Sequence, residues 1–200
     1  LLTRKLRLRA GPGYRPVGLD QLVDGVRSLV AASIGPGFSI ANARWLSGGA
    51  SKLQMAFDLD WDDPENGRQV TAMVLRMEPA ESIVATSRLR ESQLIQAMEG
   101  KVPVPKVYWC DEEGEHLPSP ALIYGFSQGV TKPSDSGSGV SGTGITLTPK
   151  VRKALGDQFV GHLAAIHSVD FRTRDLSAFT APAPGTQCAE WSVAWWERVW

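Results

Sequence analysis

The sequence predicts an α+β fold: a small lobe made of an antiparallel sheet and a helix, followed by the first helices of a second lobe. Two observations predict it. Two stretches of alternating apolar and polar residues flank a turn-rich loop, which is the pattern of a β-hairpin. A stretch with helical spacing and two more extended stretches follow, and this order of strand pair, helix and strands is not that of a parallel sheet.

The first expected element is a helix over residues 19–32, where apolar residues recur at three- and four-residue spacing. The run Gly35-Pro36-Gly37 ends it, and residues 38–46 fit a strand. Residues 53–60 form a half-buried strand, because one face of it is apolar throughout: Leu53, Met55, Phe57 and Leu59. After a turn, residues 69–76 return as the second strand of the hairpin.

A second helix is expected over residues 86–98, where Gly100 closes it. The prolines of the stretch VPVPKVYW force extended backbone, and its end is expected to be a strand. Residues 121–126 give one more apolar strand. These elements complete the predicted small lobe.

Residues 127–147 are rich in glycine and serine, which predicts an irregular connector or lid. We therefore divide the chain into residues 1–126, a leader and the small lobe, and residues 127–200, the connector and the beginning of a helical large lobe. Thr148 and Pro149 begin a helix as N-cap and first-turn proline. Its expected buried stripe is Leu155, Phe159, Leu163 and Ile166, and a last helix carries Trp191, Trp195 and Val199 at four-residue spacing.

The composition of the chain argues against several classes of function. Lys plus Arg and Asp plus Glu both number 21, so the formal net charge is zero, which argues against a nucleic-acid partner. The exception is the basic stretch LLTRKLRLRA, which we interpret as a solvated terminus. No apolar run approaches the length of a membrane span. Cys110 and Cys188 stand in no CxxC spacing and the three histidines are scattered, so we expect a cytoplasmic protein with no metal cluster.

Neither end of the chain looks natural. Position 1 is not Met, and Trp200 falls inside an amphipathic pattern without a stop signal. We therefore expect the chain to be a fragment of a longer protein.

Two features have the residue types of a phosphate site. The stretch 47–51 holds Gly48 and Gly49 between two strands, where backbone amides could approach a phosphate, although an ordinary hairpin turn has the same pattern. Arg76 lies on the same strand face as Ala72 and Val74. A guanidinium there needs a partner or a bound anion if it is buried, or it reaches water from the strand end.

Glu91 is the candidate partner of Arg76. It shares a helix face with Leu94, Ile95 and Met98, so we expect it to point inward while Arg88 and Arg90 face solvent. An inward Glu within hydrogen-bonding reach of an inward Arg is the arrangement that binds ATP phosphates in kinases. A local pair between Glu91 and Arg88 is the open alternative.

Taken together, these segments resemble the aminoglycoside phosphotransferase and choline kinase family, which has a protein-kinase-like two-lobed fold. The resemblance runs from about Trp45 to the end of the chain. It rests on LSGGASKLQMAF, VLRMEP, RLRESQLIQAM, VPVPKVYWC, ALIYGFSQGV and a helix ending in HLAAIHSVDF. The chain is most similar to a bacterial branch, itself similar to the kinase domains fused to acyl-CoA dehydrogenases, in which an Arg commonly replaces the phosphate-binding Lys.

The resemblance implies a nucleotide site. Gly48, Gly49 and Ser51 match the loop that covers the nucleotide, Arg76 matches the phosphate-contacting base, and Glu91 matches its helix partner.

The resemblance also implies a hinge. Tyr124, Gly125 and Phe126 match the segment whose backbone contacts adenine, and Val74 would pack against the ring. Gly125 stands where the family usually has an acidic residue. Lys52 departs from the asparagine that is common after the loop serine.

By the same resemblance, the parent protein is an ATP- and magnesium-dependent kinase whose partner is a small-molecule hydroxyl substrate. The family's catalytic His-Gly-Asp run, its asparagine and its metal-binding aspartate do not occur here. They are expected downstream of Trp200, so the chain alone should be inactive. A hydroxyacyl thioester is favoured over an antibiotic as acceptor, and the oligomeric state stays open. The alternative is a pseudokinase-like nucleotide-binding or regulatory module.

Overall fold

The structure is a computed structural model, and it describes residues 17–46, 52–78, 86–129, 148–181 and 183–199. Three expectations lie outside the described residues: the basic N-terminal stretch, the loop with Gly48, Gly49 and Ser51, and the irregular connector over residues 130–147.

Five strands form one antiparallel sheet in the order β1-β2-β3-β5-β4. Their bounds are β1 Ser39–Trp45, β2 Leu53–Asp63, β3 Gly67–Met77, β4 Val107–Asp111 and β5 Ala121–Gly125. The predicted hairpin is confirmed, since β2 and β3 pair continuously from Leu53 opposite Met77 to Asp63 opposite Gly67. Gly67 has a positive φ of 74°, which lets the chain reverse directly into β3.

One face of the sheet forms the hydrophobic core under α2, Leu19–Ile34. The expected alternation in β2 is confirmed, because Met55, Phe57 and Leu59 are buried in this core. In α2, Gly25 lies against the loop after β4. A Cβ at that position would lie 2.6 Å from Cδ2 of Leu117 and 2.9 Å from the carbonyl oxygen of His116.

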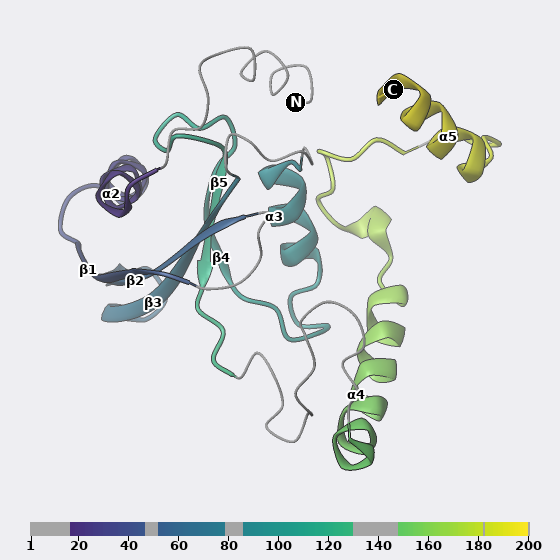
Figure 1. The fold of residues 1–200 in the computed structure, drawn as a ribbon, viewed down its shortest axis with the longest axis horizontal. Coiled ribbons are helices and arrows are strands. Elements are labelled where there is room, and N and C mark those ends of the chain that lie inside the picture. The colour runs from purple at the N-terminus through teal and green to yellow at the C-terminus, as the bar shows by residue number, and fades with distance from the viewer. Residues whose placement is uncertain (1–16, 47–51, 79–85, 130–147, 182, 200) are drawn as a thin grey trace.

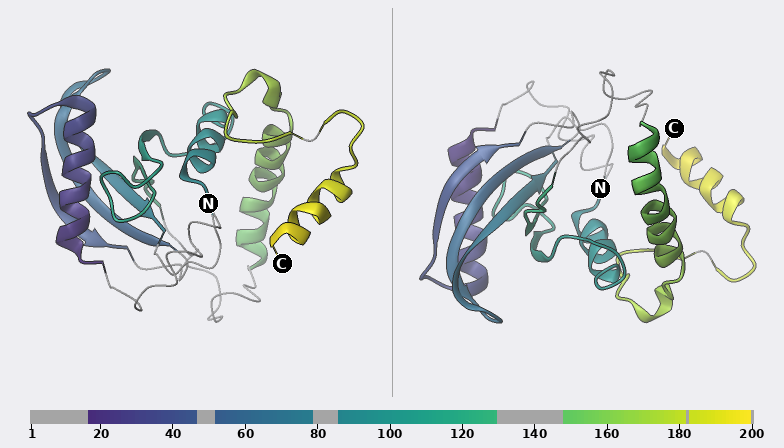
Figure 2. Two further views of the ribbon diagram at one scale, coloured as in Figure 1. Left: turned by 90° about the horizontal axis from the view of Figure 1, so that it is seen from above. Right: turned by 90° about the horizontal axis from the view of Figure 1, so that it is seen from below.

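The other face of the sheet turns toward α3, Arg88–Ala97, so the sheet lies between two helices (Figure 2). Ser87 caps α3 by accepting a hydrogen bond from the backbone N–H of Arg90 at 3.2 Å. The expected apolar face of this helix is wrong for Leu94, which is 47% exposed, whereas Ile95 and Met98 are half-buried. The buried residues of the helix are Arg88, Ser92, Gln93 and Ala97. Arg88 packs on charged groups, and Gln93 on the opposite side packs on residues 175–178, so polar residues occupy buried positions on both sides of α3.

Two further helices, α4 Pro149–His167 and α5 Cys188–Val199, lie beyond α3 and away from α2 (Figures 1 and 2). A short 3₁₀ turn, η1 Phe171–Thr173, follows α4. The predicted start of α4 is confirmed, since Thr148 accepts a hydrogen bond from the N–H of Val151 at 3.4 Å and Pro149 occupies the first turn.

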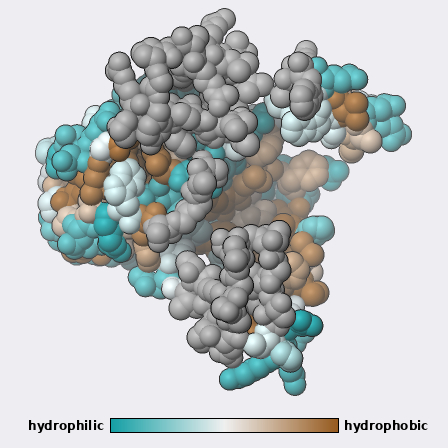
Figure 3. Space-filling model, in the orientation of Figure 1, coloured by the Kyte–Doolittle hydropathy of each residue, from teal (hydrophilic) through white to brown (hydrophobic). Residues whose placement is uncertain are grey.

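The apolar stripe expected on α4 is present but has no cover among the described residues. Phe159 is 69% exposed, and Leu155, Leu163 and Ile166 are exposed as well. Hydrophobic surface appears over α4 and α5 in Figure 3. The physical reason is that no described residue of α4 is buried by another part of the described chain. No described helix is both long enough and apolar enough to cross a membrane.

Candidate functional site

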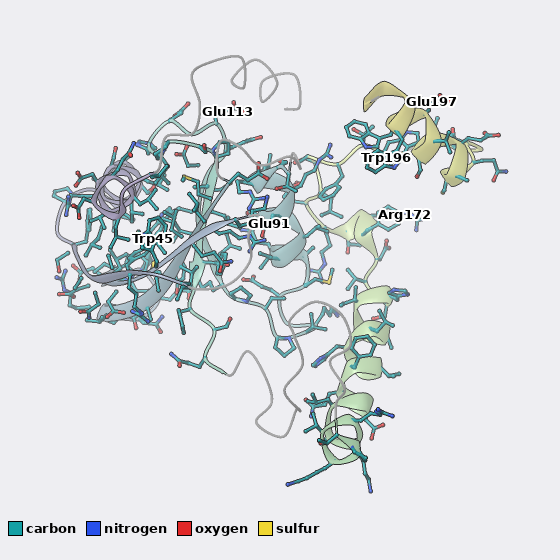
Figure 4. All side chains as sticks on the ribbon, viewed as in Figure 1. Trp45, Glu91, Glu113, Arg172, Trp196 and Glu197 are labelled. Carbon is teal, nitrogen blue, oxygen red and sulfur yellow. The ribbon has the colours of Figure 1, made fainter. Side chains whose placement is uncertain are left out.

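Arg76 of β3 and Glu91 of α3 meet between the sheet and the helix. Arg76 Nε lies 2.8 Å from Glu91 Oε1, and both side chains are about three-quarters buried. The alternation of β3 places Arg76 and Val74 on the face opposite the core. Glu91 lies where α3 faces the sheet (Figure 4). The predicted approach is confirmed. The Nε–H of Arg76 is not directed at the carboxylate, so the contact is an ion pair without hydrogen-bond geometry at that atom.

Arg88 also contacts Glu91, from within α3. Its Nη1 lies 2.5 Å from Glu91 Oε2, and only 1% of its side chain is exposed. The expectation that Arg88 faces solvent is therefore wrong. Thus both the inward pair and the local pair left open by the sequence exist, one on each oxygen of Glu91.

A second carboxylate, Glu78, lies on the other side of Arg88. Glu78 Oε1 is 3.5 Å from Arg88 Nη2 and 2.5 Å from Lys52 Nζ. Thr86 hydrogen-bonds to Glu78 through its hydroxyl and, at 3.0 Å, through its backbone N–H. The Thr86 hydroxyl also accepts from Arg88 and, at 3.0 Å, from Lys52. The result is one connected charged cluster of Lys52, Arg76, Glu78, Arg88 and Glu91.

A cavity of about 390 Å³ opens beside this cluster. Four of the residues proposed from the sequence line it: Val74, Glu91, Tyr124 and Phe126. Its other lining residues are Leu46, Gln54, Ile95, Pro105 and Ser127. The charged residue among these is Glu91, and Arg76, its partner at 2.8 Å, adjoins the cavity without lining it. The largely apolar wall suits a flat ring.

The proposed hinge is built into the sheet. The N–H of Gly125 donates to the carbonyl of Lys106, and the N–H of Phe126 donates to the carbonyl of Ala72, both at 2.9 Å. Neither N–H is therefore left to bind a ligand. Gly125 does not line the cavity, whereas Tyr124 and Phe126 do. Burial raises the pKa of the Tyr124 hydroxyl, and the charge of Arg76 opposes that rise.

The sequence argument missed Lys52, Glu78 and Arg88 as members of the site. A signal for Arg88 was present, because it lies one helical turn before Glu91 and can share its carboxylate. Glu78 follows β3 directly, and no periodicity shows that it turns back toward α3.

The sequence argument also missed a contact between α3 and the segment after η1. The side-chain amide of Gln93 donates to Asp175 Oδ1 at 3.2 Å and to Ser177 Oγ at 2.8 Å, and it accepts from the N–H of Ala178 at 3.0 Å. Arg90 donates to the carbonyl of Ala178 at 2.8 Å. These contacts hold the outer side of α3.

An antiparallel five-stranded sheet, a helix whose carboxylate meets a strand arginine, and a cavity beside them define a protein-kinase-like α+β fold. The sequence profile of the phosphotransferase enzyme family matches residues 54–198. The chain belongs to this family.

One solved structure supports the fold, and two others show a weaker similarity. A candidate aminoglycoside phosphotransferase from Ralstonia eutropha JMP134 is 19% identical with a TM-score of 0.53, and the match covers 81% of this chain and 43% of that one. Aminoglycoside phosphotransferase APH(4)-Ia is 18% identical with a TM-score of 0.44, and 74% and 40% are covered. A thermostable mutant of that enzyme, in ternary complex with AMP-PNP and hygromycin B, is 18% identical with a TM-score of 0.43, and 74% and 40% are covered.

The chain thus spans about two-fifths of the length of these structures. No curated protein matches the chain.

Proposed function

We propose that the complete protein is a kinase that transfers a phosphoryl group from ATP to a hydroxyl of a small molecule, and that this chain carries its nucleotide-binding lobe. The observation that supports the proposal is the contact of Arg76 with Glu91, at 2.8 Å, beside the cavity that Val74, Tyr124 and Phe126 line. A guanidinium beside an apolar slot can bind the phosphates while the slot receives adenine.

In this proposal Arg76 binds the phosphates and Glu91 orients it. Val74, Tyr124 and Phe126 pack against the adenine ring. Residues 1–126 form the leader and small lobe, and residues 127–200 form the connector and the start of the large lobe. Gly48, Gly49 and Ser51 would cover the phosphates, and the backbone of Gly125 would belong to the hinge.

ATP supplies the phosphoryl group, and magnesium neutralises its charge in this class of reaction. Within the described ranges, no group of three or more His, Cys, Asp or Glu side chains could hold a metal ion. We place the magnesium ligands, with the catalytic aspartate, in the part of the complete protein that lies outside this chain. Both cysteines are free thiols, which supports the cytoplasm as the compartment.

The test is binding of the ATP analogue AMP-PNP to the chain, measured by titration calorimetry. We expect binding by the wild type, and about tenfold weaker binding by Arg76→Met, which is about 1.4 kcal/mol. Arg68→Met is the matched control, because Arg68 lies on the same strand but is half exposed and pairs with Asp60. Equal affinity of the Arg76 and Arg68 variants would contradict the proposed site. Phosphoryl transfer by the complete protein then separates a kinase from a nucleotide-binding module without catalysis.

A further inference from the structure

We propose that Arg88 is a positioning residue, which holds one oxygen of Glu91 so that the charge of Arg76 stays available to an anion. The inference rests on the proposed function in one respect, namely that this anion is the phosphate chain of a nucleotide. Arg88 would not contact the ligand. It would act through Glu91.

The geometry places Arg88 between two carboxylates. Its Nη1 lies 2.5 Å from Glu91 Oε2, and its Nη2 lies 3.5 Å from Glu78 Oε1. Its side chain is 1% exposed, so water cannot screen these contacts. An arginine buried to this extent costs desolvation free energy, and paired carboxylates are what offset that cost.

Among the described residues, the charges of the cluster do not balance. Three cations, Lys52, Arg76 and Arg88, face two carboxylates, Glu78 and Glu91. In the part of the chain that the structure describes, Nε of Arg76 and both Nε and Nη1 of Arg88 are buried and have no directed hydrogen bond. A cluster with one surplus positive charge and undirected donors favours the arrival of an anion.

The two carboxylate oxygens of Glu91 contact different arginines, and this determines which arginine keeps uncompensated positive charge. Oε2 is occupied by Arg88, so Arg76 has only Oε1 and is only partly neutralised. Without Arg88, both oxygens of Glu91 would be available to Arg76, and the bidentate pair that carboxylates and guanidinium groups prefer could form. Arg76 would then bind an external phosphate less well. The sharing of Glu91 thus makes Arg76 an anion site.

A purely structural role for Arg88 is the competing explanation. It would anchor the start of α3, and its loss would weaken the fold without any special link to Arg76. The two explanations differ in one measurable quantity, the coupling between Arg88 and Arg76 in anion binding.

The experiment measures the affinity of the chain for AMP-PNP and, separately, for tripolyphosphate, which carries phosphates but no adenine. We expect Arg88→Met to weaken both by about tenfold. Arg90→Met, the matched control on the same helix, should change them less than about twofold, since Arg90 contacts Ala178 and Phe179 and not the charged cluster.

The decisive variant is the double substitution Arg76→Met with Arg88→Met. If Arg88 acts through Arg76, the double variant binds tripolyphosphate no more weakly than Arg76→Met alone, within about twofold. The inference would be overturned if the loss of affinity in the double variant were the product of the losses in the two single variants. It would also be overturned if Arg88→Met bound tripolyphosphate as tightly as the wild type.

Folding is checked by circular dichroism. If Arg88→Met does not fold, Arg88→Lys replaces it in the same cycle. A lysine keeps the charge but cannot contact two carboxylates as a guanidinium does, so an intermediate loss is expected. Wild-type affinity of Arg88→Lys would also overturn the inference. If the wild-type chain binds tripolyphosphate but does not bind AMP-PNP, the proposed function is refuted and the role of Arg88 is not. If the wild-type chain binds neither ligand, both are refuted.

Discussion

Glu91 is shared by two arginines. Its Oε1 lies 2.8 Å from Arg76 Nε on the sheet, and its Oε2 lies 2.5 Å from Arg88 Nη1 on its own helix. The position of α3 is therefore tied to the sheet through charge, on the side where the cavity opens.

Substitution Glu91→Gln keeps the shape of the side chain and removes its charge. In the complete protein we expect kcat/KM for ATP to fall by about tenfold to 100-fold, because the arginines are no longer oriented by a carboxylate. Arg88 is 1% exposed and would keep only Glu78 as a carboxylate partner among the described residues, so we also expect a loss of unfolding free energy of about 1–3 kcal/mol. Glu99→Gln, on the exposed turn after α3, is the control. A stability loss without a kinetic loss would contradict this role.

Substitution Gln93→Ala removes the amide that joins α3 to the segment after η1. Three hydrogen bonds are lost, but Asp175 and Ser177 are exposed and Asp175 still accepts from the N–H of Ser177, so we expect a net loss of about 0.5–1.5 kcal/mol. We expect faster amide hydrogen exchange in α3 and in residues 175–179 together. Gln96→Ala, an exposed position on the same helix, should leave exchange in residues 175–179 unchanged. Faster exchange in both variants would show that α3 is not held by Gln93.

Substitution Gly25→Ala should destabilise the small lobe. The new Cβ would lie 2.9 Å from a backbone oxygen at His116, which cannot move as a side chain can. We expect a loss of about 1–3 kcal/mol in urea unfolding. Gly161→Ala in α4 is the control, because nothing lies within 4 Å of the Cβ built there. That substitution should instead stabilise its helix by up to about 1 kcal/mol.

The Cys110 thiol should be a slow nucleophile. Burial, followed by the charges of Glu112 and Asp111, raises its pKa to about 11 from an ordinary 9.0. The thiolate is the reactive form, so at pH 8 we expect iodoacetamide to modify Cys110 about 100-fold more slowly in the folded chain than in urea. The pKa of this thiol is higher in the folded chain than in the unfolded chain. Its contribution to the free energy of unfolding is therefore fully present below pH 9.0 and is lost as the pH rises from 9.0 to about 11. Peptide mass spectrometry measures the rate, with the exposed Cys188 as internal reference.

The chain made alone should self-associate. Phe159, Leu163, Trp191 and Trp195 are all exposed apolar residues on α4 and α5. Surfaces of this kind promote contact between molecules. We expect Phe159→Gln with Leu163→Gln to shift the chain toward monomer in light scattering, and Leu94→Gln on α3 to have a smaller effect. A monomeric wild type at about 100 μM would contradict this prediction.

The chain should also fail to turn over ATP in the presence of magnesium. Its sequence has no His-Gly-Asp run, and positioning with metal-assisted charge neutralisation supplies most of phosphoryl-transfer catalysis. A coupled assay measures the rate of ADP release by this chain and by a chain extended through the large lobe. Turnover by the present chain would mean that the active site is misplaced.

Sequence alone determined the elements whose pattern is local. The alternation of Leu53 to Leu59 fixed the buried face of β2, because successive strand residues point to opposite sides. Thr148 and Pro149 fixed the start of α4 for an equally local reason, since the cap bonds a backbone N–H three residues away. The meeting of Arg76 with Glu91 was also predictable, because each element separately placed its charged group on the inward face.

Tertiary structure decided what each face meets. Leu94 is exposed and Arg88 is buried, contrary to the helical apolar pattern, because α3 packs on Glu78 and on residues 175–179 instead of an apolar layer. Phe159 is exposed for the complementary reason, since its stripe has no cover in the described chain. Periodicity gives the direction of a side chain relative to its own backbone. Whether that side chain is buried depends on which other segment packs against it. Segments distant in the sequence make these contacts, so only the three-dimensional structure determines burial.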